Sequence, residues 1–204
     1  MDNKKKSIIV LILVMFFILI ALLLTDGYLD FFNNFIYTQV AKLIHPWLTA
    51  ILRVFTEVGD LYGIVSIIIL LLINKETRSF SLPVGLTVLF SHFLNQVLKS
   101  LFAIPRPNIL RLIEITGFSF PSGHAMNNAT LYFLLLFITL RKNITKNQRI
   151  FNIVFFSFMV FIIGFSRVYL GVHTASDILA GWLFGLALAL ISDLVISLRK
   201  KRVS

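Results

Sequence analysis

The sequence predicts an all-α integral membrane protein, a bundle of six transmembrane helices with both termini in the cytoplasm. Of its 204 residues, 58% are hydrophobic and only 14% are charged. A soluble domain carries roughly one quarter charged residues. The apolar residues also gather in runs near the length of about 20 residues that crosses a bilayer. Because no linker, repeat or low-complexity tract interrupts these runs, we expect one membrane-embedded domain over residues 1–204.

The first expected span covers residues 7–24, directly after Lys4 to Lys6. A signal peptide would be shorter and would end at a small-residue cleavage site. Here Thr25 and Asp26 follow instead, so the run predicts a retained helix. Further helices are expected at about 54–73, 80–101, 121–140, 150–165 and 175–197. The helix at 54–73 is the least regular of the six, because charged residues occupy its start; they are Arg53, Glu57 and Asp60.

The distribution of the basic residues sets the expected topology. With six crossings and a cytoplasmic N-terminus, four basic clusters fall on the cytoplasmic side, as the positive-inside rule requires. The net charge of +10 is then a consequence of topology, and its expected partners are membrane lipids rather than nucleic acid. The clusters are Lys4 to Lys6; Lys75 and Arg78; Arg141, Lys142, Lys146 and Arg149; and Arg199 to Arg202.

Three cations lie at the ends of spans or in loops on the opposite, outward side. Any one of Lys99, Arg106 and Arg167 could simply extend to the lipid headgroups. Together they alternate with further polar residues in three ordered blocks. The blocks are Lys99 with Arg106 and Pro107; Pro121, Ser122, Gly123 and His124; and Ser166 and Arg167 with His173 and Asp177.

These blocks resemble the tripartite signature of the type 2 phosphatidic acid phosphatase superfamily. Its bacterial membrane branch includes phosphatidylglycerophosphatase B and undecaprenyl pyrophosphate phosphatase. The resemblance covers all signature positions and, through the six-helix layout, most of the chain. It implies hydrolysis of a lipid phosphate through a phosphohistidine, with no cofactor and no metal. By this resemblance the catalytic residues are His173, His124 and Asp177, and the phosphate-binding residues are Lys99, Arg106, Ser122, Gly123 and Arg167.

The chemistry of phosphoryl transfer independently favours these residue types. Negative charge gathers on the equatorial oxygens, so a site without a metal needs fixed cations and backbone donors. We expect residues 121–124 to form the first turn of a helix, whose free N–H groups attract anions. Gly123 would allow a close approach there, and Ser122 would add a hydroxyl donor.

The two histidines have distinct expected roles. His173 and Asp177 are four residues apart, so on a helix the carboxylate can orient the ring and leave its other nitrogen free to attack. His124 would protonate the leaving oxygen and then activate water. The nine carboxylates are otherwise scattered, which disfavours a metal site. We assign no role to His92, because buried polar residues of membrane bundles often bond across helices. Glu57 and Asp60 could line the substrate entrance, and Arg111 and Glu114 could tune the choice of headgroup, but interfacial solvation explains these four equally well.

Several functional alternatives remain open at this point. The substrate is either phosphatidylglycerol phosphate or undecaprenyl pyrophosphate, which the motifs do not distinguish. A lipid phosphotransferase would pass the phosphate to another lipid instead of water. A non-catalytic transporter of anionic lipid would need the cations but not the histidines. We expect a multi-pass protein of a bacterial cell membrane, with its active site toward the extracytoplasmic side and no obligatory protein partner.

Overall fold

The computed structural model describes residues 2–203, which are all helical or loop, without a strand in that range. The side chains of residues 199–203 are not described, so the predicted cluster Arg199 to Arg202 lies outside the described residues, as do the ends of the predicted domain, residues 1 and 204. Eight helices follow one another within 2–203: α1 (Asn3–Thr25), α2 (Asp30–Ala41), α3 (Pro46–Val58), α4 (Leu61–Ile73), α5 (Arg78–Phe102), α6 (Gly123–Leu140), α7 (Lys146–Tyr169) and α8 (Ala175–Val203).

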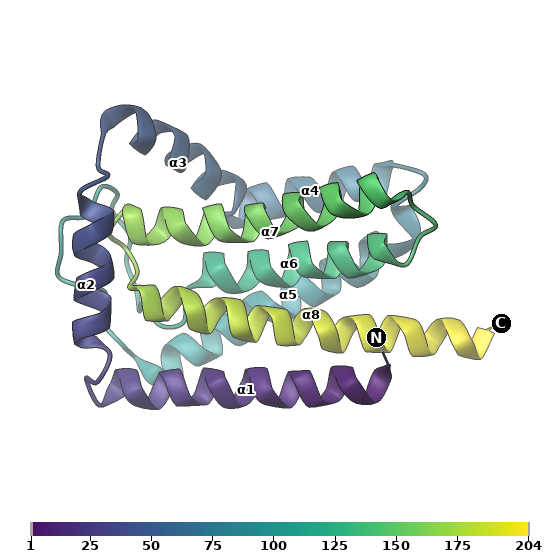
Figure 1. Ribbon diagram of the computed structural model, residues 1–204, viewed down its shortest axis with the longest axis horizontal. Helices are drawn as coiled ribbons and strands as arrows, with labels where there is room; N and C mark the ends of the chain where they lie inside the picture. The colour runs from purple at the N-terminus through teal and green to yellow at the C-terminus, as the bar shows by residue number, and fades with distance from the viewer. Residues whose placement is uncertain (1, 204) are drawn as a thin grey trace.

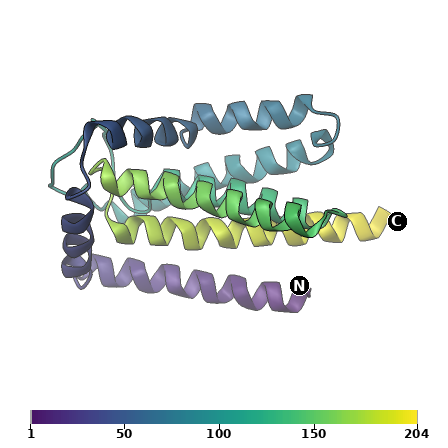
Figure 2. The ribbon, with the colours of Figure 1, turned by 45° about the horizontal axis from the view of Figure 1, so that its top comes forward.

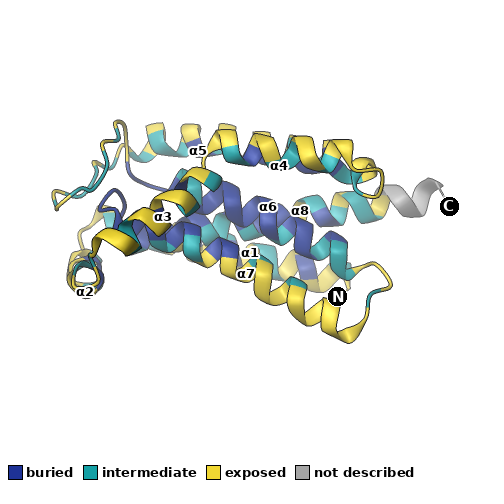
Figure 3. Cartoon of the chain, turned by 90° about the horizontal axis from the view of Figure 1, so that it is seen from above, coloured by how far each residue is buried: buried dark blue, intermediate teal, exposed yellow. Residues whose placement is uncertain are grey.

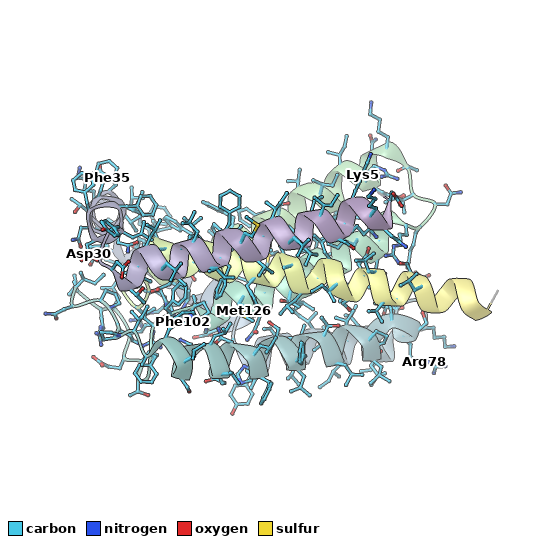
Figure 4. The ribbon with its side chains drawn as sticks, turned by 90° about the horizontal axis from the view of Figure 1, so that it is seen from below. Lys5, Asp30, Phe35, Arg78, Phe102 and Met126 are labelled. Atoms are coloured by element: carbon cyan, nitrogen blue, oxygen red, sulfur yellow. The ribbon has the colours of Figure 1, made fainter. Side chains whose placement is uncertain are left out.

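The long helices run side by side between two ends of an elongated bundle (Figure 1). Both chain ends lie at one end of the bundle, and α2 lies across the opposite end. Helices α1 and α4 form opposite outer sides, with the other long helices between them (Figure 2). Lys5 and Arg78 lie at the end that holds the termini, while Asp30, Phe35 and Phe102 lie at the other (Figure 4). The first two basic clusters therefore share one end of the molecule.

Within residues 2–203, four helices are long and apolar enough to cross a membrane, namely α1, α5, α7 and α8. Helices α3 and α4 would together make a fifth span, bent by 57° at the break between them. The expected continuous helix at 54–73 is therefore wrong, because the chain turns at Gly59 and Asp60. The all-helical membrane class is confirmed, whereas the count of six spans and their orientation stay predictions.

Helix α6 forms the centre of the bundle. It is buried along nearly its whole length (Figure 3), and it packs against α5, α7 and α8. Its contact with α8 depends on two glycines four residues apart. A Cβ atom on Gly181 would lie 2.8 Å from the Cβ of Ala125, and one on Gly185 would lie 2.4 Å from the carbonyl oxygen of Met126. Small residues at this spacing let two membrane helices approach closely.

The segment 25–53 contains more structure than the sequence predicts. It lies between the first two helices expected from the sequence, and it forms α2 and most of α3. Two hydrogen bonds join Asn33 of α2 to the start of α8: the Asn33 amide nitrogen donates to the Ser176 hydroxyl (2.9 Å), and the Ser176 backbone N–H donates to the Asn33 carbonyl oxygen (3.0 Å). Phe31 and Phe35 of α2 nevertheless remain exposed, so these two aromatic side chains do not pack into the bundle.

A buried ion cluster joins three segments at the end that holds the termini. Lys6 of α1 and Asp193 of α8 form a salt bridge, and both side chains are buried. Arg141, at the end of α6, contacts the same carboxylate and donates to the Asp193 carbonyl oxygen (2.8 Å). The cluster therefore fixes α1 against α8.

We expect Asp193→Ala to destabilise the protein. Removal of one partner leaves the Lys6 ammonium buried without its counter-ion, which costs about 3 kcal/mol. The melting temperature in detergent should fall by roughly 5–10 °C for a chain of this size. Lys5→Ala is the matched control, because Lys5 belongs to the same basic cluster but is exposed. Equal melting temperatures for the Asp193→Ala variant and the wild type would contradict this role.

Candidate active site

A cavity of about 240 Å³ is lined by residues near the end of α5, the start of α6 and the end of α7. These helix ends lie toward the end of the bundle opposite to the chain termini (Figure 1). The cavity brings together the three cations and the two histidines singled out in the sequence. These five residues come from five different segments, so only the packing of the bundle makes them neighbours. The predicted residues at the cavity wall are Lys99, Arg106, Gly123, His124, Arg167 and His173, and they are joined there by Asp60, His92 and Asn95 among others.

His173 and Asp177 form a buried pair, as expected, but not on one helix. His173 precedes α8, which begins at Ala175, and its Nδ1 atom lies 3.4 Å from Asp177 Oδ2 in the first turn. Ser119 contacts both partners: its hydroxyl donates to Asp177 Oδ2 (2.6 Å) and lies 3.2 Å from His173 Nδ1. The Thr174 backbone N–H also donates to Asp177 Oδ2 (2.8 Å). The carboxylate is thus fixed from three directions.

Arg106 holds the second nitrogen of the same ring. One of its terminal nitrogens lies 3.3 Å from His173 Nε2 and donates to the Val172 carbonyl oxygen (2.8 Å). Its Nε and other terminal nitrogen donate to the carbonyl oxygens of Gly117 (3.2 Å) and Thr116 (3.1 Å). Backbone carbonyls therefore hold the guanidinium beside His173, and no carboxylate among the described residues forms an ion pair with it.

The other two cations are held by uncharged groups as well. Lys99 donates to the backbone carbonyl oxygens of Phe118 and Ser119. Arg167 is only 2% exposed and donates from one terminal nitrogen to the Thr56 hydroxyl (2.6 Å). Its Nε atom has no hydrogen-bond acceptor among the described residues. A buried donor without a partner costs about 1–3 kcal/mol of stability, and an anion that accepts a hydrogen bond from this Nε would recover that free energy.

The start of α6 differs from the expectation in one respect. The helix begins at Gly123, so Pro121 and Ser122 precede the first turn instead of forming it. The buried Ser122 hydroxyl caps α6 by accepting from the Ala125 N–H (3.5 Å), and it does not line the cavity. Gly123 does line the cavity, where a Cβ atom would lie 2.8 Å from Asn95 Oδ1. The Ser122 hydroxyl oxygen thus caps the helix start, and its contribution to phosphate binding stays a prediction.

His124 faces the break between α3 and α4. Its Nε2 atom lies 3.8 Å from Asp60 Oδ1. A second cavity, of about 530 Å³, adjoins the first and shares Asp60, His124 and Arg167 with it. Glu57 and Glu114 line only this second cavity. The side chain of His124 therefore stands at the boundary between two spaces.

Burial controls the charge of the loop residues at the site. It lowers the pKa of His173 to about 4, although the hydrogen bond and charge of Asp177 oppose this shift. Burial also lowers the pKa of Arg106, again against the charge of Asp177. At neutral pH His173 is consequently uncharged, and one of its two ring nitrogens is unprotonated.

Comparison with known sequences decides the family. The sequence pattern of the PAP2 superfamily matches residues 80–201. The chain belongs to the PAP2 superfamily. It is 30% identical over 162 residues to phosphatidylglycerophosphatase B of Bacillus subtilis, covering 74% of this chain and 77% of that protein. It is 29% identical over 170 residues to undecaprenyl-diphosphatase of Sulfolobus acidocaldarius, covering 80% and 76%.

A solved structure extends the similarity to the whole fold. The crystal structure of a transmembrane PAP2-type phosphatidylglycerolphosphate phosphatase from Bacillus subtilis superposes with a TM-score of 0.83 at 25% identity. The alignment covers 94% of this chain and 96% of that one. The superfamily predicted from the three blocks of residues is therefore confirmed.

Part of the site lies outside the stretch that matches the PAP2 pattern. Thr56, near the end of α3, and Asp60, at the break between α3 and α4, both precede residue 80. Sequence reasoning did not select Thr56 or Ser119, because isolated hydroxyl residues carry no recognisable spacing. Asp60 was noticed only as an interfacial charge. Its proximity to His124 follows from the bend between α3 and α4, which no pattern in the sequence announces.

We expect Ser119→Ala to slow a PAP2 reaction that depends on His173. The hydroxyl orients both Asp177 and the His173 ring, and a hydrogen bond to a charged group contributes about 1.5 kcal/mol. This corresponds to roughly a tenfold lower kcat, which a phosphate-release assay measures. Ser157→Ala on the exposed face of α7 is the control. An unchanged kcat for Ser119→Ala would show that Asp177 needs no such support.

Proposed function

We propose that this PAP2 protein hydrolyses a lipid phosphate or diphosphate through a phosphohistidine, without a metal, at the extracytoplasmic side of the membrane. The chain is a membrane protein and a lipid phosphate hydrolase, in keeping with its named relatives. The observation that carries the finer mechanism is one cavity whose wall holds both histidines and all three cations. The three cations complement the negative charge of a transferring phosphoryl group, and the two histidines suit its attacking side and its leaving side.

Substrate binding would satisfy the donors that face the cavity. The phosphate oxygens lie among Lys99, Arg106 and Arg167, where the free Nε of Arg167 gains an acceptor. The first N–H groups of α6, at Gly123, add donors and the positive end of the helix dipole. Because protein carbonyls and hydroxyls already hold the cations in place, little reorganisation accompanies binding.

His173 would act as the nucleophile. Asp177 and Ser119 occupy the side of its Nδ1, so the neutral ring presents Nε2 to phosphorus. A bond forms from Nε2 to phosphorus while the bond from phosphorus to the lipid oxygen breaks, and His124 gives its proton to that oxygen. His124 then accepts a proton from water, whose oxygen attacks phosphorus and releases inorganic phosphate and free His173.

We further propose six membrane crossings, made by α1, the α3–α4 pair, α5, α6, α7 and α8, within a single phosphatase domain. The basic residues Lys5 and Arg78 lie at the end that holds the termini, and the cavity lies at the other. The positive-inside rule then places both termini in the cytoplasm and the cavity at the outer boundary. A headgroup can enter there while its acyl or prenyl chains stay in the bilayer.

Two substrates remain candidates, phosphatidylglycerol phosphate and undecaprenyl pyrophosphate, and the named relatives include phosphatases of both kinds. Side-by-side assays of the purified protein on these two lipids would choose between them. A phosphotransferase would yield a phosphorylated acceptor lipid in place of free phosphate. A transporter would keep its function after His173→Ala, since binding requires only the cations.

Rapid acid-free quenching with a ³²P-labelled lipid phosphate should trap a phosphohistidine. We expect label on His173 in the wild type, little of it in His124→Ala, because the departing lipid oxygen lacks its proton donor, and none in His173→Ala. Phosphate release should continue in EDTA and stop with vanadate, whose bipyramidal form resembles the transferring group. Loss of activity in EDTA with rescue by a divalent ion would overturn the mechanism.

The pH dependence of kcat/KM should be bell-shaped. His173 must be neutral, and its pKa is lowered to about 4, so activity rises with pH through a limb that lies below the ordinary histidine value of about 6.5. Activity then falls at higher pH, where His124 no longer holds the proton for the leaving group. A flat profile from about pH 5 to 9, with chemistry rate-limiting, would contradict the assignment of the two histidines.

A further inference from the structure

His124 must hold a proton in surroundings that disfavour one. Lys99 from α5, Arg106 from the loop before α6 and Arg167 from α7 line the same cavity. His92 from α5 and His173 from the loop before α8 line it too, and neither carries negative charge. Positive neighbours favour the neutral form of an imidazole. An acid that donates to the leaving group therefore needs a compensating negative charge nearby.

Asp60 is the carboxylate that can supply this negative charge. Within the described residues, it is the acidic side chain that lines the catalytic cavity and also contacts His124, at 3.8 Å. Asp177 is already committed to His173, Ser119 and the Thr174 N–H. Glu57 and Glu114 face the adjoining cavity, on the far side of His124.

The break between α3 and α4 holds Asp60 at this place. Asn128, one turn after His124 on α6, donates both to the Gly59 carbonyl oxygen (2.7 Å) and to the His124 carbonyl oxygen (2.9 Å). A Cβ atom on Gly59 would lie 2.4 Å from Ile163 of α7, so only glycine permits this approach. Asp60 occupies the N-cap position of α4, yet its side chain makes no capping hydrogen bond. Its carboxylate is therefore left to face the cavity.

We propose that Asp60 is a positioning residue that holds the proton on His124 and aims it at the leaving oxygen. This inference rests on the proposed phosphatase function. In the first step the proton passes from His124 to the lipid oxygen as the phosphorus–oxygen bond breaks. In the second step His124 takes a proton from water, and the negative Asp60 stabilises the resulting imidazolium. Asp60 thus serves His124 as Asp177 serves His173, but from a segment outside the stretch that matches the PAP2 pattern.

The test compares Asp60→Asn with the wild type on two substrates, a lipid phosphate and 4-nitrophenyl phosphate. An alkyl oxygen needs a proton to leave, whereas 4-nitrophenolate departs as a stable anion. We expect Asp60→Asn to lower kcat/KM, which reports the steps up to formation of the phosphohistidine, about tenfold or more on the lipid phosphate, within the range of general acid catalysis. On 4-nitrophenyl phosphate kcat/KM should change less than about threefold. The alkaline limb of the pH profile on the lipid phosphate should move to lower pH, with the acid limb unmoved.

Two further variants separate this role from a structural one. Asp60→Glu should restore most of the activity and return the alkaline limb toward its wild-type position. Asp30→Asn, which removes an exposed carboxylate at the same end of the bundle (Figure 4), should leave both substrates and both limbs unchanged. The melting temperature of each variant is measured as well, and a value equal to that of the wild type excludes loss of fold as the cause.

Failure of the role of Asp60 can be distinguished from failure of the proposed phosphatase function. If Asp60→Asn slows both substrates equally and leaves the alkaline limb in place, Asp60 does not act through the proton of His124. If Asp60→Asn has no effect on an active wild type, the inference also fails while the phosphatase function stands. If the folded wild type releases no phosphate from any lipid, the proposed function fails and the role of Asp60 fails with it.

Discussion

The close approach of α6 and α8 is the contact on which the rest of the structure depends. Gly181 and Gly185 leave no room for a side chain between the two helices, so the start of α6 lies directly against the start of α8. The Ser122 backbone N–H donates to the Asp177 carbonyl oxygen (3.2 Å) across this contact. His124 and His173 consequently reach one cavity, although 48 positions separate them along the chain. Without hydrophobic association between helices inside a bilayer, such backbone contact is a main source of specific packing.

The cations and the carboxylates around the cavity contact different partners. Three cations are gathered where a phosphate would bind, and they are held mainly by carbonyl and hydroxyl oxygens instead of carboxylates. A carboxylate in direct contact would compete with the substrate and reduce the attraction for it. The acidic groups instead serve the two histidines, Asp177 beside His173 and Asp60 beside His124. The pattern keeps the phosphate site positive while each histidine retains a negative neighbour.

The basic residues expected in the cytoplasm and the residues of the cavity lie toward opposite ends of the bundle. The described basic residues of the first two clusters lie with the chain ends, together with the buried Lys6–Asp193 contact. The cavity lies toward the opposite end, where the α3–α4 break forms part of its wall. The stretch that matches the PAP2 pattern supplies α5 to α8 and most of the cavity wall. The preceding helices add Asp60 to the cavity wall and hold Arg167 through the Thr56 hydroxyl, so they contribute to the site and not only to membrane anchoring.

The sequence by itself determined the class of protein and the superfamily, and it singled out three cations and two histidines that line one cavity. Long apolar runs announce helices because a bilayer leaves backbone groups no partner outside a helix, and the ordered blocks from Lys99 to Asp177 keep a spacing that chemistry requires. Only the tertiary structure decided the break at Gly59 and Asp60, the helix in residues 30–41 and the place of Ser119. These features depend on contacts between distant segments, such as Asn128 with Gly59 or Asn33 with Ser176. Local sequence does not encode such contacts, because each partner alone is an ordinary polar or small residue.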